Sequence, residues 1–542
     1  MSEIETKEKE PEVKDKESGE VTGELLQTAQ PETPSISTEA ILDAKYVQIK
    51  DLTGADEGKI VRIRGFLHIK REKKSFCFFV VRQEIYTIQL FVDNIKLPEA
   101  KKITVESFID IVGLLTKSKQ DIKSCTAHDV EIQTELITVV TSAESPLPIQ
   151  VNQLAIPVAA PVKKPPKKEK GKSKDKEIEK EKEIEKEKEE DKDEEKLDNN
   201  PALVTSLTFR SLDLRSQANW GIFRISSAIC RLFREFLTAN DFIEIHTPKL
   251  CPGRSEGGAN CFELKFFDQV ATLAQSPQIY KQMCVCGGLR RVFEIAPAFR
   301  AEKANTLRHL CEFTSLDFEM EITQYEQLPI FALNMFRFIF DGLNAQCKPE
   351  IAAVRQQYPA EDLVYDSTDH IIDFRDACQI LKSAGIEQDP LEDVGTEAER
   401  LLGKLIKDQR KTDIYVLSKF PLASRAFYTQ PDVPDEEKGT GESEGSKEKE
   451  RFGKYGLAFD VELRGEEIVS GAQRIIDVDL LKERAQAVGA TIPQSYIDAF
   501  RYGAPLHGGI GVGLERLTGK FLGLNSAKKC SLFPRFYGPM YC

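Results

Sequence analysis

The alternation of apolar and polar residues divides the chain into two structured regions. From Ile60 to Asp93 the two kinds of residue alternate in short runs, and two further runs, ESFIDIVGLLTKS and CTAHDVEIQTELITVV, continue the pattern. Such alternation is typical of β-strands with one buried face. It predicts about five short strands, which suit a small closed barrel, although a small β-sandwich would give a similar pattern.

The second structured region begins near Thr208 and runs to the end of the chain. Its first stretch places Ile222, Ile225 and Ile229 at helical spacing and predicts a long amphipathic helix. Strand-like runs follow in hairpins, among them CEFTSLDFEMEI and GLAFDVELRGEEIVSGAQRIID, without regular alternation of strand and helix. This order predicts an α+β domain built on an antiparallel sheet flanked by helices.

Polar segments flank, join and interrupt the two regions. Residues 163–196 contain fourteen basic and fourteen acidic residues and almost nothing able to enter a core, which is typical of a linker or a solvated charged helix. The N-terminal extension is also polar, and we expect it to be disordered. The predicted organisation is an extension at 1–44, a barrel at 45–151, a charged linker at 152–207 and a large domain at 208–542 with a polar insert at 434–452.

Composition narrows the class of protein. A chain of 542 residues with 41% hydrophobic residues is large enough for an enzyme of several domains. The net charge is −13, yet residues 58–140 carry fourteen Lys or Arg against ten Asp or Glu, a local excess that permits nucleic-acid binding by the barrel.

The twelve cysteines lack the paired CxxC spacing of zinc sites. No apolar run approaches the roughly 18 residues of a membrane span, and the N-terminus has no targeting pattern, so we expect a cytoplasmic protein without a membrane partner.

The stretch FRAEKANTLRHLCEFTSLDFEM sets charged residues among apolar ones at close to two-residue intervals. Strand periodicity puts Arg300 and Glu302 on one face of a first strand. It puts Phe313, Ser315 and Asp317 on one face of a second strand. A face with a guanidinium, carboxylates and an aromatic ring could hold a nucleotide, but a solvent-facing hairpin with cross-strand ion pairs explains the same residues equally well.

Two other stretches favour the nucleotide hypothesis. GGIGVGLERL lets the backbone approach a ligand closely and places Arg516 at a helix start. FDVELRGEEIVSGAQRI carries Asp460 and Glu467, which could share a Mg²⁺ ion if the strands bring them together; exposed acids are the alternative.

Taken together, these motifs resemble the class II aminoacyl-tRNA synthetases. PKL at Pro248, FRAE with HLCEFTSLDFEM, and GVGLERL are similar to motifs 1, 2 and 3 of that class. SEGGANCFEL, QSPQIYKQM and RGEEIVSGAQR resemble the cytosolic aspartyl branch of the aspartate, asparagine and lysine subgroup. The resemblance covers roughly residues 45–151 and 208–536. It implies an anticodon-binding barrel of the OB-fold, followed by a class II catalytic domain.

The resemblance also implies an ATP site. Arg300 would bind the α-phosphate and stabilise the charge that builds there, while Phe313 and Arg516 would enclose the adenine. Mg²⁺ would be held by Asp460 and Glu467. The implied ATP-binding set is Arg300, Glu302, His309, Phe313, Glu467, Gly513 and Arg516, of which Arg300 and Arg516 are catalytic.

L-aspartate is the amino acid that the resemblance implies. Lys281 and Arg474 would pair with its side-chain carboxylate, and an asparagine amide would leave these two cations poorly matched. Lys281 therefore argues against an asparaginyl enzyme. No side chain need act as a general base, because the reacting carboxylate is already a nucleophile. The implied aspartate-binding set is Glu256, Ser276, Gln278, Lys281, Asp317, Ser470 and Arg474.

The implied macromolecular partners are the tRNA for aspartate and a second copy of the chain. Phe78 would stack on an anticodon base, and Gln89, Ser124 and Glu131 would bond to base edges. The alternative for Phe78 is the barrel core, because three phenylalanines in SFCFFVV cannot all face outward; alternation puts Phe76 and Phe78 on one face. The helix before motif 1 would form the interface of a two-fold homodimer.

Other functions remain open at the level of sequence. An asparaginyl enzyme would share most of the motifs, and an aspartate–ammonia ligase on the same fold would have no reason to carry the barrel. A non-catalytic RNA-binding paralogue predicts loss of the ATP-site residues, but Arg300, Phe313, Asp460, Glu467 and Arg516 are all present.

Overall fold

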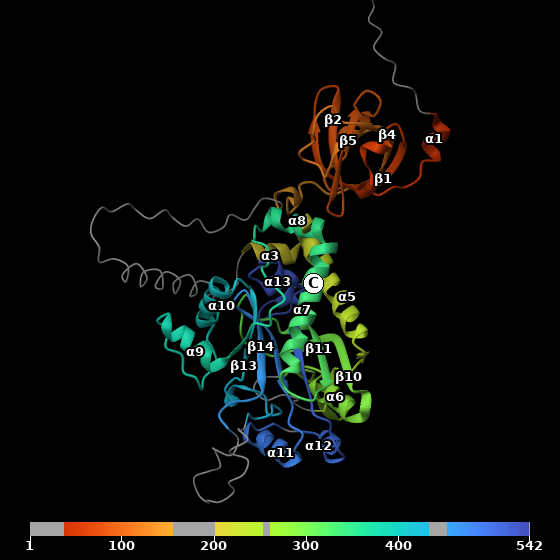
Figure 1. Ribbon diagram of the computed structural model, residues 1–542. Helices are drawn as coiled ribbons and strands as arrows, with labels where there is room; N and C mark the ends of the chain where they lie inside the picture. Colours follow the sequence, from red (N-terminus) through yellow and green to blue (C-terminus); the bar gives the residue numbers. More distant parts are fainter. Residues whose placement is uncertain (1–36, 155–200, 253–260, 433–452, 491, 541–542) are drawn as a thin grey trace, which may run out of the picture.

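The computed structural model describes residues 37–154, 201–252, 261–432, 453–490 and 492–540. The predicted polar insert at 434–452 lies outside these residues, as do most of the predicted extension and most of the predicted linker. The described part of the chain forms a smaller N-terminal domain and a larger C-terminal domain (Figure 1). Within it, no helix combines the length and the apolar character needed to cross a membrane.

The N-terminal domain is a closed five-stranded barrel, which confirms the prediction from alternation. Ile63, Leu90 and Ile111 are fully buried inside it, and the neighbours of Ile63 and Leu90 along their strands are more exposed. Closure in the order β1-β2-β3-β5-β4 leaves no free sheet edge. The elements are α1 (Thr38–Leu42), β1 (Ile60–Glu72), β2 (Phe76–Gln83), β3 (Tyr86–Asp93), β4 (Phe108–Lys117) and β5 (Ala127–Thr141).

The C-terminal domain is built on an eight-stranded sheet within the described residues. The central strands pair antiparallel, as predicted, while the end pairs β12/β13 and β10/β6 are parallel. In sheet order the strands are β12 (Ile371–Asp373), β13 (Ile414–Ser418), β14 (Ala458–Leu463), β15 (Glu467–Gln473), β16 (His507–Gly513), β11 (Glu312–Glu321), β10 (Arg291–Phe299) and β6 (Ile243–Glu244).

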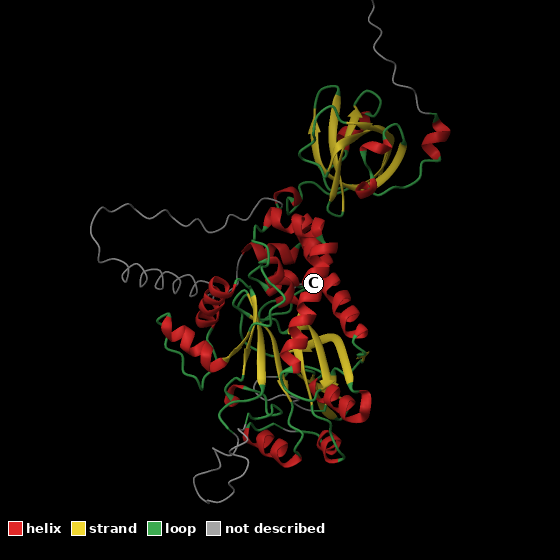
Figure 2. Ribbon diagram, in the orientation of Figure 1, coloured by secondary structure: helices red, strands yellow, loops and turns green. Residues whose placement is uncertain are grey.

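Long helices cover one face of this sheet (Figure 2). The predicted amphipathic helix is α5, and Ser216 caps it by accepting a hydrogen bond from the Asn219 amide at 3.2 Å. Leu316 and Phe318 of β11 are fully buried against the inward faces of the covering helices. The helices of this layer are α5 (Gln217–Ala239), α7 (Gln327–Gln346), α8 (Lys348–Gln357) and α13 (Leu514–Leu522).

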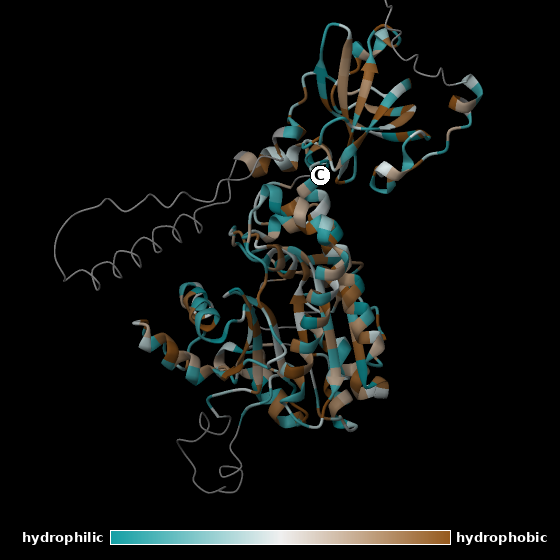
Figure 3. Cartoon of the chain, turned by 45° about the horizontal axis from the view of Figure 1, so that its top comes forward, coloured by the Kyte–Doolittle hydropathy of each residue, from teal (hydrophilic) through white to brown (hydrophobic). Residues whose placement is uncertain are grey.

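The remaining elements surround the other parts of the sheet. Helix α3 begins at Pro201, inside the range that composition assigned to the linker, and Leu207 near its end is buried. Apolar and polar residues mix along the elements of both domains, as Figure 3 shows. These elements are α3 (Pro201–Thr208), α4 (Arg210–Asp213), α6 (Gln278–Cys284), α9 (Phe374–Ser383), α10 (Thr396–Arg410), α11 (Val478–Ala487), α12 (Gln494–Arg501) and a small sheet of β7 (Leu250–Cys251), β9 (Gln269–Leu273) and β8 (Glu263–Phe266).

The sheet face away from the long helices carries polar side chains in register. Asp317 of β11 lies opposite Gly511 of β16, which lies opposite Ser470 of β15, which in turn lies opposite Asp460 of β14. These four residues form a row across four strands. Because Gly511 has no side chain, the centre of the row stays open: a Cβ atom there would lie 3.2 Å from Asp317 Oδ1.

Candidate active site

A cavity of about 290 Å³ lies over this polar face of the sheet. Its walls come from strands β11, β15 and β16, from helix α6 and from the loop after β10. Of the residues predicted for the ATP and aspartate sites, Glu256 lies outside the described residues. The cavity brings together all the others in those two sets: Ser276, Gln278, Lys281, Arg300, Glu302, His309, Phe313, Asp317, Glu467, Ser470, Arg474, Gly513 and Arg516.

The charged hairpin differs from its prediction in one strand. Strand β10 ends at Phe299, so Arg300 and Glu302 lie in the following loop and the predicted strand face for them is wrong. The Arg300 amide still donates to the Cys311 carbonyl at 2.9 Å, but the ladder stops there. The second strand is as predicted, since Phe313, Ser315 and Asp317 all line the cavity. The Arg300 guanidinium lies 5.4 Å from the centre of the Phe313 ring.

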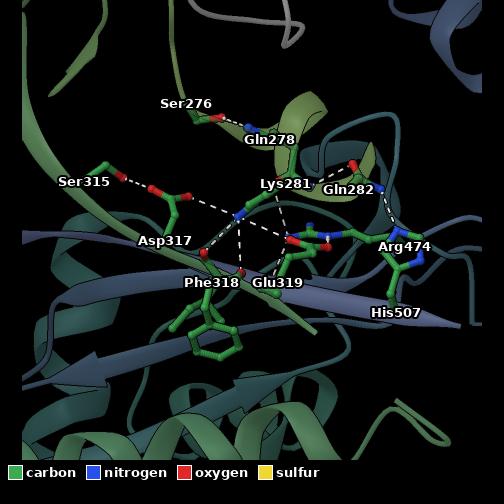
Figure 4. Close-up of polar contacts among 12 residues, drawn as sticks. Ser276, Gln278, Lys281, Gln282, Ser315, Asp317, Phe318, Glu319, Arg474 and His507 are labelled. Atoms are coloured by element: carbon green, nitrogen blue, oxygen red, sulfur yellow. Dashed lines mark hydrogen bonds and ion pairs between the residues drawn. The ribbon is translucent and has the colours of Figure 1, made fainter. Parts of the chain in front are cut away.

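Two buried cations stand at one end of the cavity (Figure 4). Lys281 Nζ lies 3.1 Å from Asp317 Oδ1, 3.3 Å from Glu319 Oε2 and 3.0 Å from the Ile510 carbonyl. Arg474 donates from Nε to Glu319 Oε1 at 2.8 Å. Burial opposes ionisation of Glu319, but Arg474 and Lys281 outweigh it and hold the pKa of that carboxyl below its usual value. Their carboxylate partners therefore fix both cations in place before any ligand arrives.

A second cavity of about 220 Å³ adjoins the first and is rich in carboxylates. Burial and the nearby Glu467 raise the pKa of Asp460 to about 7, despite the opposing charge of Arg425. Burial likewise raises the pKa of Glu399 to about 7. Glu462 is buried, and its Oε2 has no hydrogen-bond partner among the described residues.

The donor set of the second cavity fits a hard divalent cation. Asp460 and Glu467 both line it, as the sequence predicted for a shared ion, and carboxylate oxygens are the ligands that Mg²⁺ prefers. Within the described ranges, no group of three or more His, Cys, Asp or Glu residues is placed to hold a metal. A Mg²⁺ ion held by two carboxylates would take its remaining ligands from water and substrate phosphates.

The comparisons with known proteins agree with this site. The model of the tRNA synthetases class II (D, K and N) matches residues 203–537. The chain belongs to this class II synthetase family. It is 39% identical over 502 residues to the cytoplasmic aspartate–tRNA ligase of Bos taurus, covering 91% of this chain and 90% of the relative. It is 37% identical over 545 residues to the cytoplasmic aspartate–tRNA ligase of Caenorhabditis elegans, covering 96% and 94%.

A solved class II synthetase shares the architecture of both domains. The aspartyl-tRNA synthetase from Entamoeba histolytica superposes with a TM-score of 0.73 at 37% identity, covering 91% of this chain and 92% of that one. The barrel and the sheet domain are therefore common to the two proteins, and the order of the two domains inferred from the sequence holds.

On the barrel of this class II synthetase, three of the four predicted RNA-facing residues, Phe78, Gln89 and Glu131, occupy the neighbouring strands β2, β3 and β5. Phe76 and Phe78 share one face, as alternation predicted, with ring centres 5.3 Å apart, while Phe79 is fully buried. Gln89 Nε2 donates to Glu131 Oε2 at 2.9 Å, which joins β3 to β5. Ser124 is exposed in the turn before β5.

Sequence reasoning missed several residues of the synthetase site. Arg425 lies between the two cavities, donates to both oxygens of Asp460 at 3.0 and 2.8 Å, and lies 3.7 Å from the Phe420 ring. Glu399 reaches the second cavity from helix α10. Neither lies near a sequence motif, because tertiary packing alone brings them to the site. Glu462 could have been found, since it is two residues from Asp460 on the same strand face.

Proposed function

We propose that this protein is an aspartate–tRNA ligase that activates L-aspartate with ATP and transfers it to the 3′-terminal adenosine of the tRNA for aspartate. The observation that carries the proposal is the pair Lys281 and Arg474, two buried cations at the end of a cavity whose other walls suit a nucleotide. The aspartate–tRNA ligase relatives, which match this chain over most of its length, support the same activity. Their cytoplasmic location supports a cytoplasmic location here.

In the first step an oxygen of the aspartate α-carboxylate attacks the α-phosphorus of ATP, and pyrophosphate leaves. Arg300, beside the Phe313 ring at the cavity wall, would stabilise the negative charge that builds on the α-phosphate. Phe313 and Arg516 would enclose the adenine, and His309 would reach the terminal phosphates. Burial lowers the pKa of His309, and a phosphate bound beside the imidazole would raise it again.

The remaining ATP-site residues have supporting roles. Gly513 would let the backbone approach the nucleotide, and Glu302 would lie near the adenine or the acceptor end of the tRNA. Asp460 and Glu467 would hold Mg²⁺, which when bound neutralises phosphate charge and assists departure of pyrophosphate. The excess of carboxylates in the second cavity supports this assignment.

Aspartate itself would be bound by groups of matching charge. Lys281 and Arg474 would receive its side-chain carboxylate, and Asp317 would receive the ammonium group. The same set would include Ser276, Ser470 and Glu256, with Gln278 on the α-carboxylate. In the second step the terminal hydroxyl of the tRNA attacks the acyl carbon and AMP leaves, with a substrate phosphate able to take the proton.

The barrel would read the anticodon. Phe78 is half-buried among the Phe76 and Phe91 rings, which leaves part of its surface for a stacked base. Gln89, Ser124 and Glu131 would bond to base edges.

A two-fold homodimer would complete the assembly. Large apolar side chains are exposed around the motif 1 segment, which supports an interface there. Those with the largest exposed fractions are Phe267 at 80%, Val270 at 65%, Ile243 at 47% and Leu250 at 45%. Sedimentation at micromolar concentration should give a dimer, and an active monomer would contradict this assignment.

The decisive experiment is ATP–pyrophosphate exchange with either aspartate or asparagine as the amino acid. Aspartate should support exchange and asparagine should not. Lys281→Met should abolish exchange, because it removes a charge at the side-chain pocket while keeping the length of the side chain. Lys59→Met is the control, since Lys59 pairs with Asp56 at 2.8 Å on the surface of the barrel, does not line the cavity and should leave exchange intact. Exchange with asparagine would favour an asparaginyl enzyme, and no exchange with either amino acid, even with tRNA present, would favour a non-catalytic paralogue.

A further inference from the structure

The loop between β10 and β11 carries Arg308 and His309, which line both cavities. It spans residues 300–311 and contains neither helix nor strand. Thr306 links the two residues inside the loop, because its hydroxyl lies 2.7 Å from His309 Nδ1 and accepts from the Arg308 amide at 3.3 Å. The placement of both side chains therefore depends on where the backbone at Thr306 is held.

The C-terminal part of the chain contacts this loop immediately before and immediately after Thr306. Lys528 is fully buried, and its Nζ donates to Asn305 Oδ1 at 2.7 Å. The Ala527 amide donates to the Leu307 carbonyl at 3.0 Å. Two consecutive residues thus hold the two neighbours of Thr306, one through a side chain and the other through the backbone.

The segment that carries Lys528 is itself fixed to the core of the catalytic domain. Lys528 lies in a short 3₁₀ helix, whose last residue, Cys530, is buried in the main hydrophobic cluster. Arg210 donates to the carbonyls of Ser531 and Leu532 at 3.0 and 2.8 Å and so fixes the chain directly after this helix. The contact therefore joins a loop without regular structure to an anchored segment.

The charge of Lys528 makes this contact a strong one. A hydrogen bond from an ammonium group to an amide oxygen is charge-assisted and stronger than a bond between neutral groups. Movement of the loop away from the segment would take the Asn305 oxygen from a buried cation, which is costly. The contact therefore favours one position of the loop, in which Arg308 and His309 line the cavities.

We propose that Lys528 is a positioning residue for ATP, which holds through Asn305 the loop that presents polar groups to the terminal phosphates. The inference rests on the proposed function and deepens it, because Lys528 lines neither cavity and yet would determine how ATP binds. Aspartate would bind at the end of the cavity formed by Lys281 and Arg474. The contact should therefore matter for ATP and not for aspartate.

The test is ATP–pyrophosphate exchange for Lys528→Met and Asn305→Leu, with ATP and aspartate varied in turn. We expect either substitution to raise KM for ATP by about tenfold, the effect of one lost charge-assisted hydrogen bond, while KM for aspartate stays unchanged. Asn305→Asp keeps the acceptor and should retain the wild-type KM for ATP. Lys529→Met is the matched control, because Lys529 Nζ lies 4.5 Å from the centre of the Tyr358 ring, and it should change neither constant.

A double-mutant cycle decides whether the two residues act through one contact. If they do, Lys528→Met combined with Asn305→Leu should raise KM for ATP no further than either substitution alone. Asn305 is only half-buried in its loop, so Asn305→Leu keeps the test decisive even if Lys528→Met does not fold.

Titration calorimetry with ATP separates this inference from the proposed function, because it measures ATP affinity without turnover. Both variants should lose about tenfold in this affinity. If the wild-type chain binds ATP but gives no exchange with aspartate, the proposed function fails while the calorimetric comparison still reports on Lys528. Unchanged ATP affinity in folded Asn305→Leu protein would overturn the inference. A hundredfold rise in KM for ATP in the double variant, or an equal loss in the ATP and aspartate parameters, would do the same.

Discussion

Arg215, between α4 and α5, donates to Glu106 Oε2 at 3.1 Å and so joins the catalytic domain to the barrel. Inside the barrel, Glu106 Oε2 also accepts a hydrogen bond from Arg82 Nη2 at 2.9 Å. Burial opposes ionisation of Glu106, but His68, Arg82 and Arg215 lower the pKa of this carboxyl to about 2, so it stays charged. Arg215 also lies 4.1 Å from the Phe66 ring. This carboxylate is therefore one of the groups that join the two domains.

Replacement of Arg215 by Met should separate the two steps of the reaction. The barrel keeps its internal Arg82–Glu106 pair, so both domains stay folded, but the barrel loses one of its links to the catalytic domain. We expect kcat/KM for tRNA charging to fall by about tenfold, equivalent to 1.4 kcal/mol. Pyrophosphate exchange without tRNA should be unchanged. Arg231→Met is the control, because Arg231 pairs with Glu235 on the exposed side of α5; a similar loss in both variants would refute a specific role of the domain contact.

Gly511→Ala should weaken substrate binding without unfolding the domain. The added methyl group would lie 3.2 Å from Asp317 Oδ1, within the open centre of the polar row. We expect KM for aspartate to rise by about tenfold, since a methyl group in a tight site costs on the order of 1–3 kcal/mol. Steady-state exchange kinetics measure this effect. Gly287→Ala, where a Cβ meets no atom within 4 Å, should leave KM unchanged.

Glu515 should make stability depend on pH. Burial raises the pKa of this carboxyl to about 7 in the folded protein, from 4.5 when unfolded. Between pH 4.5 and about 7 the Glu515 carboxyl is ionised in the unfolded chain but still protonated in the folded protein. The free energy of unfolding therefore falls as pH rises through this range and is constant above about 7. Glu515→Gln keeps an acceptor for the Thr314 amide and should remove this fall, with a gain of at most about 3 kcal/mol at pH 8 and little change at pH 4. Denaturant unfolding at several pH values tests this, with exposed Glu392→Gln as the control.

Adjacent phenylalanines in β2 should behave differently on truncation. Phe79 is fully buried in the barrel core, so Phe79→Ala should destabilise the barrel by about 3–5 kcal/mol. Phe78→Ala should leave the barrel folded but weaken tRNA binding by roughly 1–3 kcal/mol, the value of one stacked base. Thermal unfolding and charging kinetics distinguish the two effects. Equal unfolding by both variants would place Phe78 in the core rather than at the RNA surface.

Periodicity in the sequence predicted those parts of the site that lie on regular strands. Phe313, Ser315 and Asp317 alternate along β11, and the structure places all three at the cavity. Arg300 and Glu302 were misplaced because β10 stops pairing after Phe299, and alternation within the sequence continues beyond the last ladder bond. A pattern of side chains does not reveal where the partner strand diverges.

The residues that sequence missed belong to elements whose position depends on long-range packing. Arg425 follows a short turn after β13, and only the packing against Phe420 brings its guanidinium to Asp460. Gln282 and His507 are 225 positions apart, and neither carries a local signal of their contact. Such pairings depend on how β16 and α6 pack against each other, and no short motif in the sequence encodes that packing.

The row from Asp317 through Gly511 and Ser470 to Asp460 restricts which changes in length this protein tolerates. Side chains on a strand alternate between faces, so inserting one residue into β16 would bring a valine or isoleucine to the polar face and turn the glycines into the core. Insertions in the connections between strands leave the row intact. Variation in chain length during evolution should therefore concentrate in the connections, while the strands of the row keep a constant number of residues.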